Sequence, residues 1–336
     1  MNIIVTGGAG FIGSNFVRMV LDEHKDTFVV NLDSLTYAGN LGNLEGYLDN
    51  EKHKFVKGDI CDAKLVDSLI TEYKIDAIIN FAAESHVDRS LVNPGIFIDT
   101  NVTGTLTLLK AALEHNIGRF LQVSTDEVYG SLGEEGMFTE QTPISPNSPY
   151  SASKASADHL VCAFGHSWGL KYNITRCSNN YGPYQFPEKM IPLMINNALN
   201  DKKLPIYGDG LYVRDWLYVY DHCTAIWKVL AEAEPGQIFN VGGNNEKPNL
   251  EVVNIILDRL GKDASLIEHV KDRPGHDRRY AIDSTKIMTE LGWKPSVTFE
   301  EGIVKTIDWY LNNEKWLKTV VSGDYQKYYD SMYSDR

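Results

Sequence analysis

Apolar runs and amphipathic segments alternate along the first half of the chain. Short apolar runs, typical of buried strands, occupy residues 2–6, 28–32, 54–59, 77–83, 120–124 and 172–177. The segments between them in which apolar positions recur with the helical period are 14–23, 62–73, 100–116 and 150–168. Strands that alternate with helices predict an α/β fold built on a doubly wound parallel sheet. Ligands bind at the carboxyl ends of such strands, and here those ends carry small or polar residues.

The second half of the chain is less regular. After residue 178 the pattern becomes richer in proline and glycine, so we place the main domain boundary there. Residues 216–230 are predicted to form a helix and residues 238–241 a strand, and we expect the stretch 211–243 to return to the first domain. The predicted organisation is therefore a first domain over 1–178 and a smaller C-terminal domain over 179–210 and 244–336.

A glycine turn follows the first predicted strand. Gly7, Gly10 and Gly13 lie where glycine allows a tight turn and a close approach of the backbone to a pyrophosphate. The N-terminus of the next helix offers free N–H groups to the same anion. Asp33 ends the second strand, 20 residues beyond Gly13, where a carboxylate binds the ribose hydroxyls of NAD and repels the 2′-phosphate of NADP. This context favours a Rossmann-type NAD site over the simpler alternative of a structural turn and an Asp that caps a loop.

Composition excludes several other classes of protein. The chain has 336 residues, with 45 acidic and 32 basic side chains and a net charge of -13, which argues against a nucleic-acid partner. Cys61, Cys162, Cys177 and Cys223 form no CxxC pair and have no ligand spacing with histidine, so we expect reduced thiols and no metal site. No apolar run reaches 18 residues and no targeting segment precedes the first strand, so we expect a soluble, cytoplasmic protein without a membrane partner.

Two carboxyl groups and a Tyr–Lys pair are the candidate chemistry. Asp126 and Glu127 follow the strand 120–124, while Tyr150 and Lys154 lie one turn apart on one face of a helix. The ammonium group is expected to lower the pKa of the phenol toward that of a general base. Neighbouring carboxyl groups raise each other's pKa, which supplies one neutral acid beside one carboxylate. Elsewhere Asp126 and Glu127 would be an ordinary solvated pair, but their place at the carboxyl edge of the sheet favours catalysis.

These motifs together resemble a known family. The glycine turn with Tyr150 and Lys154 resembles the extended short-chain dehydrogenases/reductases, and Thr125-Asp126-Glu127 resembles the nucleotide-sugar 4,6-dehydratases among them. The similarity covers nearly the whole chain except residues 327–336, which match no motif. Further matching stretches are 82–90, 124–130, 178–183, 214–216 and 272–277.

The resemblance implies a role for each catalytic candidate. Tyr150, supported by Lys154 and by the positive charge of the nicotinamide, would remove the proton of the sugar's C4 hydroxyl, and Thr125 would hydrogen-bond that oxygen. Glu127 would then remove the C5 proton, which the new 4-ketone makes acidic. Protonated Asp126 would donate to the C6 hydroxyl as it leaves as water. The cofactor would end the cycle oxidised, so the reaction is a lyase step with internal redox chemistry.

The resemblance also implies two sets of binding residues. Those for NAD are Gly7, Gly10, Phe11, Ile12, Gly13, Asp33, Ser34, Leu35, Thr36, Asp59, Ile60, Phe81, Ala82, Ala83, Glu84, Ser85, Thr100, Tyr150, Lys154 and Asn180. Those for the nucleotide sugar, with dTDP-glucose the expected substrate, are Ser85, Thr125, Asn179, Lys189, Met190, Ile191, Pro192, Leu193, Pro205, Ile206, Tyr207, Arg214, Asn249, Asp272, Arg273, Pro274, Gly275 and His276. On residue type alone, the cations in this set suit a diphosphate but equally suit a solvated loop.

Alternatives remain for assembly and for activity. The helices 100–116 and 150–168 are apolar on more than one side, which favours a homodimer with a four-helix interface, although a helix inside a large core has the same pattern. A nucleotide-sugar 4-epimerase would share the glycine turn, Tyr150 and Lys154, but would have no use for Asp126 and Glu127. A sensor or scaffold that keeps the fold without turnover is the third possibility.

Overall fold

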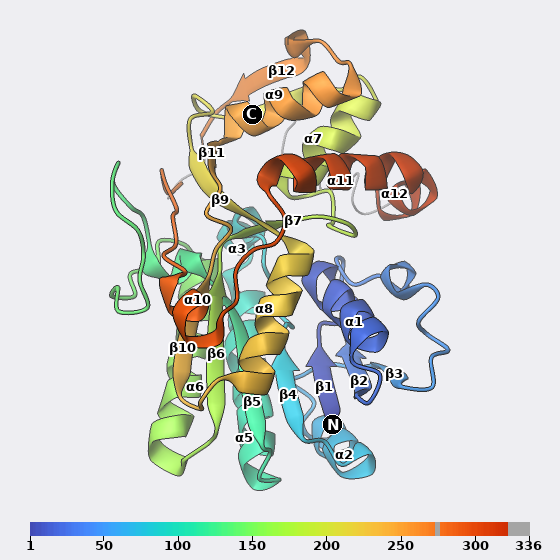
Figure 1. Ribbon diagram of the computed structural model, residues 1–336, viewed down its shortest axis with the longest axis vertical. Helices are drawn as coiled ribbons and strands as arrows, with labels where there is room; N and C mark the ends of the chain where they lie inside the picture. Colours follow the sequence, from blue (N-terminus) through green and yellow to red (C-terminus); the bar gives the residue numbers. More distant parts are fainter. Residues whose placement is uncertain (273–275, 322–336) are drawn as a thin grey trace.

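The computed structural model describes residues 1–272 and 276–321, and a parallel sheet is its centre (Figure 1). The sheet has seven strands in the order β10-β6-β5-β4-β1-β2-β3. Their bounds are β1 (Asn2–Thr6), β2 (Phe28–Asp33), β3 (His53–Lys57), β4 (Ala77–Asn80), β5 (Arg119–Thr125), β6 (Tyr172–Cys177) and β10 (Gln237–Val241). All neighbours pair in parallel, which confirms the predicted α/β class. The order reverses between β1 and β4, and this switch point is where such sheets bind ligands.

Helices cover both faces of the sheet. On one face, α1 (Phe11–Glu23) packs beside α8 (Val219–Glu232), and on the other lie α2 (Ala63–Tyr73), α5 (Thr105–Glu114) and α6 (Pro149–Trp168). Side chains alternate along each strand, so Ile3 joins the apolar core under α1 while Ile4 joins the core under α2. This burial on both faces explains why the strands are continuous apolar runs.

The second part of the chain forms a body of its own above the carboxyl ends of these strands (Figure 1). It contains a sheet of β7 (Asn179–Tyr181), β9 (Val213–Tyr218) and β11 (Glu246–Pro248), and a pair of β8 (Leu204–Tyr207) and β12 (Ile267–Val270). Its helices are α7 (Met190–Leu199), α9 (Asn249–Leu260), α11 (Phe299–Asn312) and α12 (Glu314–Val320), which share one apolar core. The chain returns to the large sheet for α8, β10 and the short α10 (Thr285–Leu291). The residue-level domain boundaries remain predictions.

Three predicted elements differ from the structure. The segment 216–230 is not one helix, because Trp216–Tyr218 pairs with β7 as the end of β9 and the helix begins at Val219. The helix 100–116 is preceded by α3 (Val87–Val92) and α4 (Pro94–Phe97) and starts with a π-helical turn, η2 (Ile98–Gly104). The first helix begins at Phe11, inside the glycine turn, and Gly10 is its N-cap.

Short 3-10 turns complete the description: η1 (Leu41–Leu44), η3 (Asp126–Tyr129) and η4 (Ala264–Leu266). No helix among the described residues is both long enough and apolar enough to cross a membrane.

Candidate active site

The glycine turn packs closely against the end of β4. Gly7 has φ +66°, and a Cβ built there would lie 2.8 Å from the backbone nitrogen of Ala82. A Cβ at Gly13 would lie 2.3 Å from the carbonyl oxygen of Gly7, so only glycine allows the helix to start this close to the strand. No side chain in the described part of the chain caps the N-terminus of α1, which leaves its first N–H groups to an anion.

Asp33 is fixed at the carboxyl end of β2. Its two carboxylate oxygens accept hydrogen bonds from the backbone N–H groups of Ala9 (2.9 Å) and Leu35 (2.8 Å). Burial raises the pKa of this carboxyl group, and these backbone hydrogen bonds oppose that rise. The side chain is therefore oriented beside the glycine turn, and each oxygen retains a lone pair for a ribose hydroxyl.

A cavity of about 560 Å³ runs along this edge of the sheet. Every residue predicted to bind the cofactor lines it except Leu35, whose backbone N–H is held by Asp33 and whose side chain packs toward the apolar core. The glycine cradle, the uncapped helix and the oriented Asp33 fit a dinucleotide. Residues that line the cavity and were missed from the sequence include Gly39, Gly58, Gln185, Phe186 and Glu188.

The acid–base pair lies where β5 passes into η3. The hydroxyl of Thr125 caps this turn by accepting from the N–H of Glu127 at 3.3 Å, and it lies 3.2 Å from one carboxylate oxygen of Asp126. Asp126 is 2% exposed, and its other oxygen has no hydrogen-bond partner among the described residues. Burial, and then the charges of Glu127 and Asp215, raise the pKa of Asp126 well above its ordinary value. This direction agrees with a neutral acid beside a second carboxyl group, and the acid role of Asp126 stays a prediction.

The Tyr–Lys pair lies in the first turns of α6. A capping box between Ser148 and Ser151 starts this helix, and Pro149 takes its first position. Tyr150 and Lys154 are both buried, and the Lys154 ammonium donates to the carbonyl oxygen of Val123 at 2.8 Å.

The pKa of Tyr150 is raised in the chain by itself, so the lowering expected from Lys154 together with the nicotinamide stays a prediction for the complex with the cofactor. Burial raises the pKa of Tyr150 well above its ordinary value, and the charge of Glu127 raises it further. Lys154 does not offset this, because burial lowers its own pKa and its ammonium is directed to a backbone carbonyl. A hydrogen bond with Thr125 lowers the pKa of Tyr150 in part.

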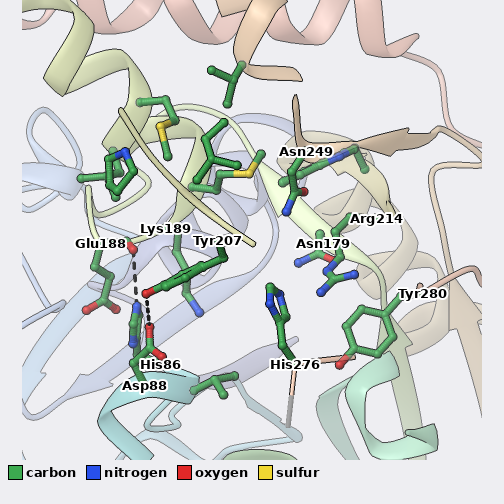
Figure 2. Close-up of a pocket in the computed structure, with 18 of the residues that line it drawn as sticks. His86, Asp88, Asn179, Glu188, Lys189, Tyr207, Arg214, Asn249, His276 and Tyr280 are labelled. Carbon is green, nitrogen blue, oxygen red and sulfur yellow. Dashed lines mark hydrogen bonds between the residues drawn. The ribbon is translucent and has the colours of Figure 1, made fainter. Parts of the chain in front are cut away.

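A second cavity, of about 140 Å³, adjoins the first and is lined by both parts of the chain. Figure 2 shows Lys189 reaching into it from one side and Arg214, Asn179 and Asn249 from the other. Glu127 and Asn179 line both cavities, so the two spaces meet beside Glu127. The predicted substrate residues that line this second cavity are Asn179, Lys189, Met190, Leu193, Pro205, Ile206, Tyr207, Arg214, Asn249 and His276.

The other predicted substrate residues lie elsewhere. Ser85, Thr125 and Ile191 line the larger cavity, and Pro192 is buried in α7 away from both. Asp272 lines neither cavity, but it contacts Nδ1 of His276 at 2.7 Å and accepts from the Tyr212 hydroxyl, so it orients a lining residue. The predicted residues Arg273, Pro274 and Gly275 lie outside the described residues.

Several lining residues of the second cavity were missed. His86, Asp88, Glu188 and Tyr280 line it, and Asp88 accepts from the Tyr207 hydroxyl at 3.2 Å (Figure 2). His86 and Asp88 lie inside the stretch 82–90 that carries the family resemblance, so the motif itself pointed to them.

Arg214 is the best-placed cation for a phosphate group. It is held from behind by the carbonyl oxygens of Val213 (2.7 Å) and Asp277 (2.8 Å), and its guanidinium lies over the Tyr280 ring at 4.5 Å. Lys189 is anchored by the carbonyl oxygen of Ser85 at 2.8 Å. Cations fixed in this way lose little side-chain entropy when an anion binds. Among residues 1–272 and 276–321, no group of His, Cys, Asp and Glu is arranged to hold a metal ion.

The fold and this site define a class of protein: an NAD-dependent enzyme of the extended short-chain dehydrogenase/reductase type that modifies a nucleotide sugar. The chain belongs to the family described as GDP-mannose 4,6 dehydratase, whose sequence model matches residues 4–306.

Similar proteins carry a narrower name within that family. A dTDP-glucose 4,6-dehydratase of Xanthomonas campestris is 57% identical over 96% of this chain and 97% of its own length. One of Escherichia coli is 51% identical over 100% of both. The structure of a dTDP-glucose 4,6-dehydratase from Bacillus anthracis in complex with NAD is 52% identical, with TM-score 0.90, covering 95% of this chain and 99% of that one. A UDP-glucose 4-epimerase of Thermotoga maritima is 29% identical with TM-score 0.87, covering 94% of this chain and 100% of that one.

Proposed function

We propose that the chain is a hydro-lyase that converts dTDP-glucose into dTDP-4-dehydro-6-deoxy-glucose with NAD as its cofactor. The observation that carries the proposal is the buried acid Asp126 beside Glu127 where the two cavities meet. Proteins that are 50–57% identical over nearly their full length bear the name of this activity. The 4-epimerase, at 29% identity, is a more distant relative.

Each catalytic side chain supports one proton movement. Tyr150 takes the proton of the C4 hydroxyl as a phenolate, the form that the positive charge of a bound nicotinamide would stabilise against the burial that raises the pKa of the phenol. Thr125 hydrogen-bonds the same oxygen. Glu127 lines both cavities and removes the C5 proton, while Asp126, kept neutral by burial, protonates the departing C6 hydroxyl. When bound, NAD would supply the acceptor for the hydride that leaves C4 and the donor of that hydride to C6, so it ends the cycle oxidised. Glu127 returns a proton to C5.

Substrate binding is assigned to the second cavity. Arg214 and Lys189 hold the diphosphate, and Tyr207 and His276 lie at right angles with ring centroids 5.8 Å apart, which provides aromatic surface for the base. Asn179 and Asn249 offer amide groups between these two regions. The enzyme accordingly binds its substrate across the junction of its two parts.

The test is a comparison of nucleotide sugars. Purified protein is incubated with dTDP-, UDP-, CDP- and GDP-glucose, and a 4-keto product is followed by its ultraviolet absorbance in alkali. We expect product from dTDP-glucose at a rate well above the other three. A product with an intact C6 hydroxyl and inverted C4 would establish the epimerase instead, and binding without any turnover would establish a sensor or scaffold.

Three further proposals concern its setting. The product is the kind of intermediate that deoxysugar biosynthesis of the dTDP-rhamnose type consumes. We propose a cytoplasmic location, since reduced thiols persist there and Cys61, Cys162, Cys177 and Cys223 are all free. We propose a homodimer through α5 and α6, where Trp168 is 58% exposed.

A further inference from the structure

A cluster of three side chains joins separate segments beside the cofactor cavity. The Tyr37 hydroxyl donates to one carboxylate oxygen of Glu188 at 2.9 Å, and Nε of Arg89 contacts the other at 3.1 Å. The Arg89 guanidinium also lies over the Tyr37 ring, 3.7 Å from its centroid. The Glu188 side chain is 2% exposed and that of Arg89 is 25% exposed. Glu188 is therefore a buried carboxyl group with both oxygens satisfied from two different segments.

The cluster spans the wall of the cofactor cavity. Thr36, Ala38 and Gly39, which flank Tyr37, line this cavity next to Asp33, where the adenosine ribose is expected. Glu188 and its neighbours, residues 185–191 apart from 187, line the same cavity from the second part of the chain. The ring of Tyr37 also meets that of Phe186 edge-on, with centroids 5.7 Å apart. The contacts of Tyr37 therefore tie together two segments of the cavity lining that come from different parts of the chain.

Two of the three residues touch neither ligand space. Tyr37 and Arg89 are absent from the linings of both cavities, whereas Glu188 lines both. The segment of Glu188 is held from the other side as well, since Nε2 of His86 lies 3.4 Å from its carbonyl oxygen and Lys189 donates to Ser85 (Figure 2). Any effect of Tyr37 on a ligand must therefore act through the position of these walls.

We infer that Tyr37, Arg89 and Glu188 form a clasp that closes the cofactor cavity and slows the release of NAD. The inference rests on the proposed function, because it takes NAD as the occupant of that cavity. A bound dinucleotide can leave this side only if the segment 36–39 separates from the segment 185–191, and that separation breaks the hydrogen bond and the cation–π contact of Tyr37. An enzyme that regenerates its cofactor in every cycle gains from such retention. Tyr37 and Arg89 are thus positioning residues.

The experiment compares two tyrosines that make the same two kinds of contact. The hydroxyl of Tyr47 donates to Asp22 at 2.6 Å and Arg18 lies 4.4 Å from its ring centroid, but this hydrogen bond is exposed and Tyr47 lines neither cavity. Wild type, Tyr37→Phe, Arg89→Lys, the double variant of these two and Tyr47→Phe are purified and loaded with radiolabelled NAD. Loss of label during a chase with excess unlabelled NAD gives the dissociation rate. Melting temperature is measured on the same samples.

We expect Tyr37→Phe to release NAD about tenfold faster than wild type, as the loss of one hydrogen bond to a buried charged group implies. Tyr47→Phe should stay within about twofold of wild type, a change too small to reflect a lost contact of that kind. If the residues act as one unit, Tyr37→Phe combined with Arg89→Lys should release NAD more slowly than the product of the two single effects predicts. Melting temperatures should not follow the release rates.

The outcomes separate the clasp from the proposed function. Equal release from Tyr37→Phe and Tyr47→Phe, in a wild type that holds NAD and turns over dTDP-glucose, would overturn the clasp alone. A wild type that neither holds NAD nor turns over this substrate would overturn the proposed function. Faster release of NAD from both tyrosine variants, with an equal fall in their melting temperatures, would also count against the clasp. The faster release would then come from a general loss of stability.

Discussion

Replacing Asp126 by Asn tests the acid without changing the shape of the site. The Asn side chain can still accept a hydrogen bond from Thr125 through its amide oxygen, as Asp126 is placed to do at 3.2 Å. Its NH₂ group replaces the oxygen that has no partner, so no existing hydrogen bond is lost. The variant removes only the proton that Asp126 gives to the C6 hydroxyl. Loss of activity would therefore report on proton donation.

The size of the effect follows from the role and the surroundings of Asp126. A positioned general acid contributes about 10²–10⁴-fold in rate, which is about 3–5 kcal/mol of barrier. We expect Asp126→Asn to reduce kcat on dTDP-glucose by that factor. The same substitution should not destabilise the fold where Asp126 would be charged. A buried carboxylate loses its hydration, whereas Asn carries no charge that needs hydration.

The sign of the stability effect depends on pH. Burial raises the folded-state pKa of Asp126 above its ordinary value of 3.8, so its contribution to stability is complete below that value and is lost as pH rises through the folded-state pKa. The Asn side chain does not titrate. The melting temperature of Asp126→Asn relative to wild type should therefore rise with pH.

The assay uses two substrates. Formation of the 4-keto product is measured with dTDP-glucose and with an analogue that carries fluoride at C6, which needs less protonation in order to leave. We expect the variant to lose much less activity on the fluoride analogue, while both substrates still bind. Equal losses on the two substrates, together with a falling melting temperature, would refute the acid role and make Asp126 structural.

Four other predictions concern the base, the cofactor, the hydride and the assembly. Glu127→Gln should bind substrate normally, and its rate of dehydration should fall by about 10²–10⁴-fold. Turnover by this variant at the wild-type rate would contradict the role of Glu127 as base. Purified wild-type protein should carry bound NAD. Asp33→Ala should reduce the ratio of the affinity for NAD to the affinity for NADP, because the carboxylate that repels the 2′-phosphate is gone. A wild type that prefers NADP would contradict the role of Asp33. Substrate deuterated at C4 should give product with deuterium in its methyl group, and in heavy water C5 should gain deuterium; NMR reads both, and loss of the C4 label to solvent would exclude internal transfer. Light scattering should give a particle of twice the mass of the chain, and Trp168→Glu should lower that mass toward the mass of one chain. A wild-type protein that is monomeric would refute the dimer.

The sheet was predictable because its physical basis is local. Strands buried on both faces are continuous apolar runs, and Gly7 and Gly13 sit where any Cβ would clash. The segment Trp216–Tyr218 was assigned to a helix because three consecutive large apolar residues fit either element. Its pairing with β7, which comes from elsewhere in the chain, decides the outcome.

The electrostatics of the site were only partly predictable. Adjacency of Asp126 and Glu127 was enough to expect a raised pKa, since proximity is fixed by the sequence. The raised pKa of Tyr150 was not predictable from the sequence. The spacing puts Lys154 one turn away, but it does not show that the ammonium group donates to the carbonyl oxygen of Val123. Glu188 was missed for a similar reason: its partners Tyr37 and Arg89 lie far from it in the sequence, and only the fold brings them together.

Two adjacent carboxyl groups can act as acid and base because the backbone changes direction between them. Thr125 ends β5 in an extended conformation and caps η3, so Asp126 turns into the protein beside Asp215 while Glu127 stays half-buried where the cavities meet. Burial then disfavours the charge on Asp126, and the charge on Glu127 disfavours it further. The same short segment therefore gives the two carboxyl groups different surroundings, and burial favours the protonated form of Asp126, which the proposed acid step requires.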